Sequence, residues 1–248
     1  MTRPADEAHD FEPEWLTIAA RMVNPATRAL MVVYDDMQAI YKGRKRPVWS
    51  QLGIDAKGRT TVLKVNYRNT SQILRFARRF AADVIGLPGV AADEEDAVLV
   101  PEDGGRSGAE PILRKCVSYE GEAHAIAQWI KESSAGGYQW GHMAVLYPEH
   151  DIGKRFAQAM RNAGVPIDVA KDNGNRLSPE RDAVRLLTMH SSKGLEFPCV
   201  AIGGLGALGK RGAIEDDVRL SYVAITRATH EAFLTYSRMS PLVERLVG

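Results

Sequence analysis

The chain has 248 residues, of which 45% are apolar and 25% are charged. This composition is ordinary for a folded domain and excludes a disordered, collagen-like or disulfide-stapled chain. The formal net charge is only +1, because 32 Lys and Arg residues balance 31 Asp and Glu residues, so any nucleic-acid surface has to be local. At roughly 100–200 residues per domain, the length fits one large domain, or one domain and a piece of another.

The cysteines and the apolar content limit the class of protein further. Cys116 and Cys199 lack the CxxC or Cys/His spacing of a zinc site, and two isolated cysteines fit a reducing compartment. No window approaches the ~18 consecutive apolar residues of a membrane span, and the polar residues 1–6 do not resemble a signal peptide. We therefore expect a cytoplasmic protein without membrane contact.

Short apolar runs alternate with stretches of helical spacing. Continuous runs of this length are typical of strands buried on both faces of a parallel sheet. After Asn69, the expected N-cap, apolar residues recur every three or four positions up to Val84. The alternation predicts an α/β fold, a parallel sheet with helices on both faces. The predicted strands are residues 30–33, 62–65, 112–117, 143–147, 184–189, 199–202 and 232–236, the further helices contain 123–130 and 156–160, and 101–108 and 171–181 are surface connections.

An acidic pair, Asp6 and Glu7, is the first polar motif. A nucleotide hydrolase needs one carboxylate to hold Mg²⁺ and a second to orient and deprotonate the attacking water. Acidic pairs are also common at helix starts, where they favour the helix dipole, so that alternative stays open. With Arg3 and Pro4, the preceding residues do not predict the apolar strand that would present such a pair.

Polar side chains also follow two predicted strands, at the edge where open α/β sheets bind ligands. Gln38 offers a donor and an acceptor to a terminal phosphate and a water, although a single Gln after a strand is usually a loop residue. Tyr67 offers a flat ring to a base, and Arg68 offers a bidentate fork to phosphate. Both are equally explained as packing residues near a helix cap.

Two C-terminal segments are the most informative. Residues 187–197 combine small polar side chains with Lys193 and Gly194 in a strand-to-loop turn, which supplies N–H groups and hydroxyls for the phosphates of a nucleotide or DNA. Glu196 can accept from a ribose hydroxyl. Residues 219–228 predict a helix carrying Arg227, whose guanidinium can neutralise charge developing on a γ-phosphate.

Taken in order, these segments resemble the UvrD/Rep branch of superfamily 1 DNA helicases. Residues 6–10 resemble its Walker B motif, 35–41 motif III, 66–68 motif IV, 188–197 motif V and 222–228 motif VI. The resemblance implies a RecA-like fold and ATP-dependent translocation on single-stranded DNA with duplex unwinding.

The resemblance also implies a role for each motif residue. Asp6 serves Mg²⁺, Glu7 activates water, and Gln38, Arg68 and Arg227 read the γ-phosphate. Tyr67 stacks on the adenine of ATP, Glu196 contacts the ribose, and Gly194 belongs to the same nucleotide site. The residues assigned to single-stranded DNA are Tyr41, Trp49, Thr188, His190 and Ser191.

Motif III departs from the family pattern. Tyr34 stands where glycine is usual, and the aromatic residue that often follows Tyr41 is replaced by the basic cluster 42–46, with Trp49 further on. Trp49 can stack on a base and the cluster can contact phosphates. An exposed basic turn that is merely solvated explains the same residues, so both interpretations stay open.

The family holds ATP between two RecA-like domains, and the first brings the P-loop. No GxxxxGK[ST] precedes Asp6, so we expect residues 1–59 to be the C-terminal remnant of the first domain, with Walker B and motif III. Residues 60–248 are then the second RecA-like domain, without the family's large inserted subdomain. Residues 204–211 match the P-loop spacing except at Arg211, which cannot supply the hydroxyl that ligates Mg²⁺, so we expect a flexible loop there.

The sequence therefore predicts the C-terminal portion of an ATP-dependent single-stranded-DNA translocase or DNA helicase. Its expected partners are single-stranded DNA and the missing N-terminal RecA-like domain of the parent chain. Without a P-loop, we expect the chain alone to be a poor ATPase. The alternative is a non-catalytic DNA- or protein-binding module on a helicase scaffold.

Overall fold

The computed structural model describes residues 3–24, 26–27, 29–34, 47–61, 65–85, 102–170, 180–210 and 214–248. Contacts divide the chain into two compact units. Unit 1 comprises the described parts of residues 1–64 and 85–101, and unit 2 those of 65–84 and 102–248. Among the described residues, no helix combines the length and the apolar character needed to span a membrane.

Unit 1 contains a small β-α-β element. Strand β1 (Arg3–Ala5) pairs in parallel with β2 (Leu30–Val32), and α1 (Pro13–Arg21) lies between them in the chain, as the crossover of a parallel pair requires. The expectation that no strand precedes the acidic pair is therefore wrong. Proline is tolerated because β1 is an edge strand within the described residues.

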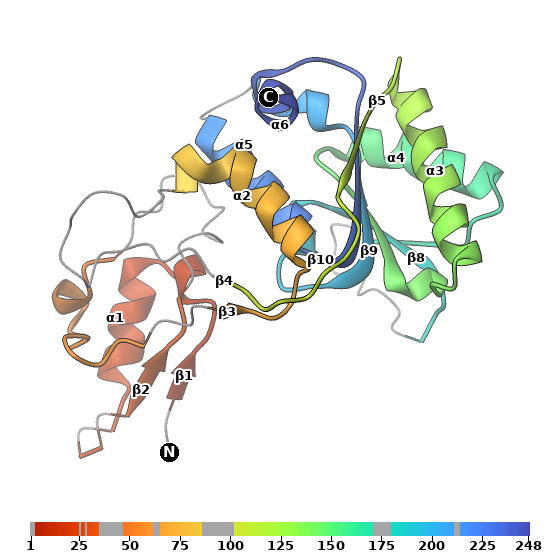
Figure 1. The fold of residues 1–248 in the computed structure, drawn as a ribbon. Coiled ribbons are helices and arrows are strands. Elements are labelled where there is room, and N and C mark those ends of the chain that lie inside the picture. The colour runs from red at the N-terminus through yellow and green to blue at the C-terminus, as the bar shows by residue number, and fades with distance from the viewer. Residues whose placement is uncertain are drawn as a thin grey trace. The chain divides into compact units, whose positions relative to one another are not determined.

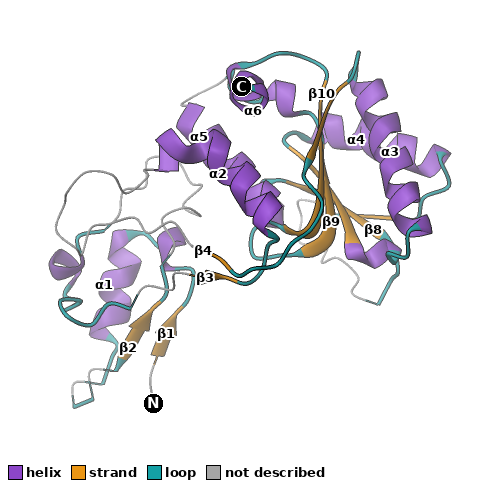
Figure 2. Ribbon diagram, in the orientation of Figure 1, coloured by secondary structure: helices purple, strands orange, loops and turns teal. Residues whose placement is uncertain are grey.

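Unit 2 is built on a six-stranded sheet with the order β5-β10-β9-β6-β8-β7, in which every pairing is parallel. Helices α3 and α4 cover one side of this sheet and α2 and α5 the other, as Figures 1 and 2 show. The predicted α/β fold with helices on both faces is confirmed. The strands are β5 (Ile112–Lys115), β6 (Met143–Tyr147), β7 (Ile167–Val169), β8 (Val184–Thr188), β9 (Phe197–Ile202) and β10 (Ala228–Tyr236), and the helices are α2 (Ser71–Ile85), α3 (Tyr119–Ala135), α4 (His150–Asn162), α5 (Ile214–Ile225) and α6 (Pro241–Val247).

The central strands account for the continuous apolar runs of the sequence. All five residues of β6 are buried, as are the first four of β8, because helices cover both faces of the sheet. On the α3 side, the Trp129 and Phe233 rings stack with centroids 5.3 Å apart. The short β7 and β4 (Glu102–Asp103) are additional to the predicted elements, whereas β3 (Val65–Asn66), which pairs in parallel with β4, overlaps the predicted strand 62–65 at Val65.

Helix α2 begins one residue later than expected. Asn69 was the expected N-cap, but the helix starts at Ser71 and the Thr70 hydroxyl accepts from the Ile73 N–H at 3.5 Å. The Asn69 amide is engaged elsewhere, since it donates to the Thr226 and Ala228 carbonyls. A side chain that bonds across the fold is not available to cap its own helix.

Candidate functional site

The loop between β3 and α2 presents the first pair of predicted nucleotide residues. The Asn66 side-chain oxygen accepts from the N–H groups of Arg68 (2.8 Å) and Asn69 (3.1 Å), which folds the loop into a tight turn. Tyr67 lies in this turn and is 72% exposed. An exposed aromatic face on a shaped loop suits stacking on a base.

Arg68 and Glu196 meet although 127 positions separate them in the sequence. The Arg68 Nε lies 2.8 Å from a Glu196 carboxylate oxygen, and the two side chains are 47% and 58% exposed. Gly194 has a φ of +75°, in the left-handed region that favours glycine, and it turns the chain just before Glu196. The structure thus brings two predicted nucleotide residues together at one surface.

Arg227 lies beside this pair but inside the protein. Its side chain is buried, with the residue 2% exposed. Its Nε donates to the Val223 carbonyl at 3.1 Å and its Nη1 to the Leu195 carbonyl at 3.3 Å. Leu195 is the neighbour of Glu196, so the guanidinium is anchored on the loop that carries the predicted ribose contact. The γ-phosphate role of Arg227 stays a prediction.

The predicted DNA residues of motif V lie at the carboxyl end of β8. The hydroxyls of Thr188 and Ser191 are 2.8 Å apart, and the Ser191 N–H donates to the Thr188 hydroxyl at 3.1 Å. Partial burial lowers the pKa of the neighbouring His190 below its usual 6.5, opposed by the Asp217 carboxylate. The three side chains therefore offer neutral hydrogen-bonding groups at pH 7.

The acidic pair lies in unit 1, directly after β1. Glu7 has a φ of +53°, the one positive value among described non-glycine residues. A Glu7 carboxylate oxygen lies 2.9 Å from Nε2 of the buried His9, while Asp6 is exposed and accepts from the Glu7 N–H at 3.0 Å. Among the described residues, the side chains grouped closely enough to share a cation are Glu7, His9 and Asp10, without the predicted ligand Asp6.

The remaining predictions of unit 1 are answered only in part. The Trp49 ring contacts the Tyr34 ring edge-on, with centroids 5.4 Å apart, and Tyr34 contacts the His9 ring at 5.8 Å. Tyr34, which replaces the usual glycine, therefore contacts both the His9 and the Trp49 rings. Gln38, Tyr41 and the basic cluster 42–46 lie outside the described residues.

The segment with P-loop-like spacing, residues 204–210, is a packed turn instead of the expected flexible loop. The Gly204 N–H donates to Glu122 at 2.8 Å and the Gly209 N–H to Asp217 at 2.7 Å. A Cβ at Gly206 would lie 2.4 Å from the Arg238 carbonyl oxygen. Protein carboxylates therefore bind two of the N–H groups that a phosphate loop would offer.

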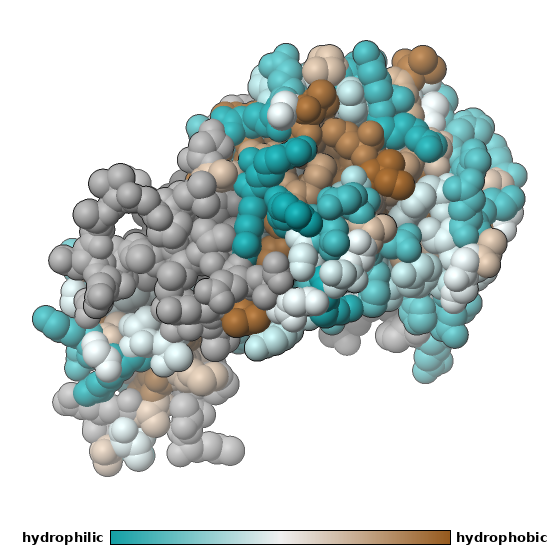
Figure 3. Space-filling view, viewed as in Figure 1, coloured by the Kyte–Doolittle hydropathy of each residue, from teal (hydrophilic) through white to brown (hydrophobic). Residues whose placement is uncertain are grey.

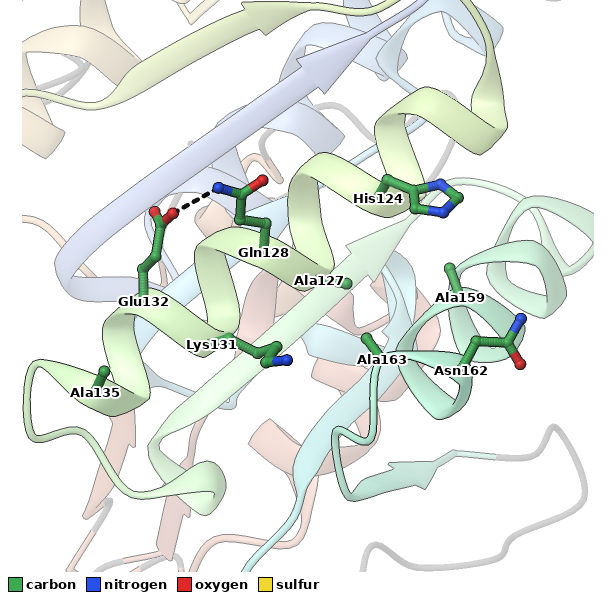
Figure 4. Close-up of a pocket in the computed structure, with 9 residues that line it drawn as sticks. All are labelled: His124, Ala127, Gln128, Lys131, Glu132, Ala135, Ala159, Asn162 and Ala163. Atoms are coloured by element: carbon green, nitrogen blue, oxygen red, sulfur yellow. Dashed lines mark hydrogen bonds between the residues drawn. The ribbon is translucent and has the colours of Figure 1, made fainter.

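A pocket of about 510 Å³ lies between α3 and α4 (Figure 4). Alanines form part of its wall, and on its rim Gln128 donates to Glu132 at 2.8 Å. None of the predicted site residues that the structure describes lines it. Figure 3 shows hydrophilic side chains over much of the described surface on the face drawn there, with apolar patches between them.

Three residues outside the predicted site, Glu122, Asn69 and Arg106, make hydrogen bonds across unit 2. The buried Glu122 carboxylate accepts from Gly204, Thr235 and Ser237, which ties α3 to the segments at the ends of β9 and β10. Asn69 and Arg106 contact backbone carbonyls of the motif loops. A hydrogen bond to a backbone carbonyl cannot be recognised from a pattern of side chains. Only the asparagine and glycine content of these loops indicated that their backbone is tightly folded.

Comparison with known proteins identifies relatives of the chain. Residues 61–175 and 170–239 match the model of the UvrD-like helicase C-terminal domain. The chain is 39% identical over 82 residues to the ATP-dependent DNA helicase PcrA of Bacillus subtilis, a match that covers 30% of this chain and 11% of PcrA. It is 45% identical over 65 residues to DNA helicase II of Escherichia coli, covering 23% of this chain and 9% of the relative.

A solved structure shares the fold. The C-terminal domain of a possible DNA helicase from Lactobacillus plantarum WCFS1 superposes with a TM-score of 0.53 and 20% identity, over 73% of this chain and 94% of that one. The matched part of the chain spans only about a tenth of the length of the curated helicases, 11% of PcrA and 9% of DNA helicase II.

Proposed function

Because the chain belongs to the UvrD-like helicase C-terminal domain family, we propose that it is the C-terminal portion of an ATP-dependent single-stranded-DNA translocase or helicase. It contributes motifs III to VI to an ATP site that it shares with a P-loop domain. The observation that carries the proposal is the convergence of Tyr67, Arg68, Glu196 and Arg227 at one hydrogen-bonded edge of unit 2.

The residues at this edge fit ATP by their chemistry. The Tyr67 ring stacks on the adenine, and Glu196 accepts from the ribose. Arg68 turns from Glu196 to the γ-phosphate, at little cost, because an exposed ion pair contributes only about 0–1 kcal/mol. Arg227 stabilises the charge that develops on the phosphate, and Gly194 lets the backbone of this loop approach the nucleotide.

The acidic pair supplies the hydrolytic groups. Mg²⁺, when bound with ATP, neutralises phosphate charge, and the exposed Asp6 carboxylate is the group that would hold it. Glu7 takes the proton of the attacking water, with His9 at 2.9 Å orienting its carboxylate. Gln38 bridges that water and the γ-phosphate.

Single-stranded DNA is the proposed second ligand. Thr188, His190 and Ser191 donate hydrogen bonds to its phosphates from the end of β8, while Tyr41 and Trp49 stack on bases. With a formal net charge of +1, the chain relies on such local contacts, including the basic cluster 42–46. Both cysteines are free thiols, which supports a reducing, cytoplasmic setting.

The phosphate loop comes from a partner domain in this proposal. The 248 residues contain no GxxxxGK[ST], and the turn after β9 has carboxylates on two of its N–H groups. We therefore propose that residues 1–59 complete a first RecA-like domain of the parent chain and that residues 60–248 form the second. The isolated chain then binds ATP weakly and hydrolyses it poorly.

Binding of Mg·ATP to the purified chain tests this function. Tyr67→Ala and Arg68→Gln should each weaken binding by roughly tenfold, because a stacked base or a charge-assisted phosphate contact is lost. Arg161→Gln, at an exposed position of α4, is the matched control and should change nothing. A chain that binds single-stranded DNA but gives no response to ATP would favour the alternative, a non-catalytic binding module.

A further inference from the structure

The segment that follows β4 packs closely on the loop carrying Tyr67 and Arg68. The Gly104 N–H donates to the Asn66 carbonyl at 2.9 Å, and a Cβ at Gly104 would lie 2.8 Å from that oxygen. A Cβ at Gly108 would lie 2.6 Å from a Thr70 methyl carbon. Only glycine allows this approach at either end of the segment, so residues 104–108 form a brace against the loop.

Arg106 is the centre of the brace. Its Nη1 donates to the carbonyls of Tyr67 (3.3 Å) and Arg68 (2.8 Å), and its own carbonyl accepts from the Ser71 N–H at 2.7 Å. Its Nη2 lies 3.1 Å from Nε2 of His230, at the start of β10. A guanidinium can only donate, so Nε2 accepts and Nδ1 carries the proton toward the Thr229 hydroxyl, 2.8 Å away.

Asn69 makes the second link, on the buried side of the loop. Its residue is 1% exposed, and its amide nitrogen donates to the Thr226 carbonyl at 2.9 Å and the Ala228 carbonyl at 2.6 Å. These two carbonyls flank Arg227 on either side. The loop that carries Tyr67 and Arg68 is therefore tied directly to the backbone that carries Arg227.

We infer that Arg106 is a positioning residue which, with Asn69, holds Tyr67 and Arg68 in fixed register with Arg227. The guanidinium of Arg106 is hydrogen-bonded to backbone carbonyls and a histidine, so it acts through the loop and not on the nucleotide itself. When the binding residues are already held in place, the loops do not have to lose conformational entropy as the ligand binds, and affinity is higher. The inference deepens the proposed function and rests on it.

Three variants of the full chain separate positioning from charge. Arg106→Gln removes both the positive charge and the hydrogen bonds that Arg106 donates to the loop. Arg106→Lys keeps the charge but lacks the planar guanidinium that makes these bonds. Arg75→Gln is the control, because Arg75 is an exposed arginine of α2 whose partner is Glu110. ¹⁵N relaxation reports the order of the Tyr67, Arg68 and Arg227 amides, and amide shifts during Mg·ATP titration report affinity.

We expect both Arg106 variants to increase the motion of the Tyr67 and Arg68 amides and to weaken Mg·ATP binding by roughly tenfold, while Arg75→Gln matches the parent chain. The urea midpoint of unit 2 should be nearly unchanged in all three, because Arg106 is only half-buried. Wild-type affinity in Arg106→Lys with a loss in Arg106→Gln would overturn the inference, since charge alone would then explain the effect.

A fourth variant and the relaxation data keep the inference separate from the proposed function. Asn69→Asp puts a carboxylate against two carbonyl oxygens and should loosen the Arg227 amide together with Tyr67 and Arg68. If the parent chain shows no shifts with Mg·ATP, the proposed function fails, and the relaxation data still decide whether the brace orders the loop. Unchanged loop order in Arg106→Gln and Asn69→Asp would overturn the inference.

Discussion

In unit 2, strands β6, β8 and β9 lie between helices on both faces and bury nearly all of their side chains. In unit 1, β1 and β2 form a two-stranded parallel sheet, and three apolar residues of the α1 region, Trp15, Ile18 and Met22, are each more than half exposed. Parallel sheets are stable when both faces are covered, and isolated two-stranded sheets are marginal. The same chain thus joins a domain with an extensive core to a unit whose described residues bury few apolar side chains.

The largest expected effect comes from dividing the chain between residues 59 and 60, which keeps all of unit 2 in the longer fragment. Residues 60–248 should fold cooperatively, because the core of unit 2 comes from their own helices and strands. Residues 1–59 should give a poorly dispersed NMR spectrum, since Ala5, Ala8 and Leu16 are the buried apolar residues among those described there. A dispersed spectrum from residues 1–59 would remove the contrast between the units.

Glu122→Gln tests how strongly unit 2 depends on its buried carboxylate. The amide nitrogen would face donors that now share two carboxylate oxygens, so we expect a loss of about 2–3 kcal/mol in the free energy of unfolding by urea. Glu132→Gln, on the exposed rim of α3, should cost less than about 0.5 kcal/mol. Equal effects of the two substitutions would show that the Glu122 network does not support the fold.

The exposed apolar residues of unit 1 should be responsible for dye binding by the intact chain. Trp15→Gln combined with Ile18→Lys should lower ANS fluorescence clearly, because these side chains lie one turn apart on α1 and are 56% and 55% exposed. Val117→Lys, at an isolated exposed position of unit 2, should leave the fluorescence nearly unchanged. If Val117→Lys lowered the fluorescence more than the double substitution in α1, the dye-binding apolar surface would lie in unit 2.

The two cysteines allow the opening of unit 2 to be followed by itself. Burial raises the pKa of the Cys199 thiol to about 12, and that of Cys116 is also raised, mainly by burial. In native buffer Cys116 should react slowly with DTNB, and Cys199 should react only when unit 2 unfolds. Rapid reaction of both thiols in native buffer would contradict the closed core.

The smallest expected effect is the contribution of His190 to the pH dependence of stability, and its sign follows from the direction of the pKa shift. Its folded pKa lies below 6.5, so its stabilising contribution is present above pH 6.5 and is lost as the pH falls through the folded value. The loss should be a few tenths of a kcal/mol, because the residue is partly exposed. His190→Asn should flatten the dependence of stability on pH below 6.5, and a steeper dependence in the variant would refute the sign.

The sequence predicts the buried part of unit 2 well and the edges less well. Strands such as β6 and β9 are continuous apolar runs because both faces are covered, which gives a strong signal. By contrast, β1 begins with Arg3 and Pro4, and β7 has only three residues, so short or polar edge strands carry almost no periodicity.

Some residues of the candidate site can likewise be predicted from the sequence, and others cannot. The sequence assigns Arg68 and Glu196 to one site from separate motifs, and the Arg68 Nε lies 2.8 Å from a Glu196 carboxylate oxygen. Arg106 and the role of Asn69 were not foreseen, because their partners are backbone carbonyls whose positions depend on tertiary structure. The expected N-cap at Asn69 failed for that reason, since a local pattern competed with a bond across the fold.

We propose that the chain supplies one side of an ATP site and lacks the phosphate loop of the other. Steady-state ATP hydrolysis by the purified chain, with saturating single-stranded DNA and with Glu7→Gln as the control, measures it directly. We expect a rate indistinguishable from that of Glu7→Gln. Turnover that single-stranded DNA stimulates and that Glu7→Gln abolishes would contradict it.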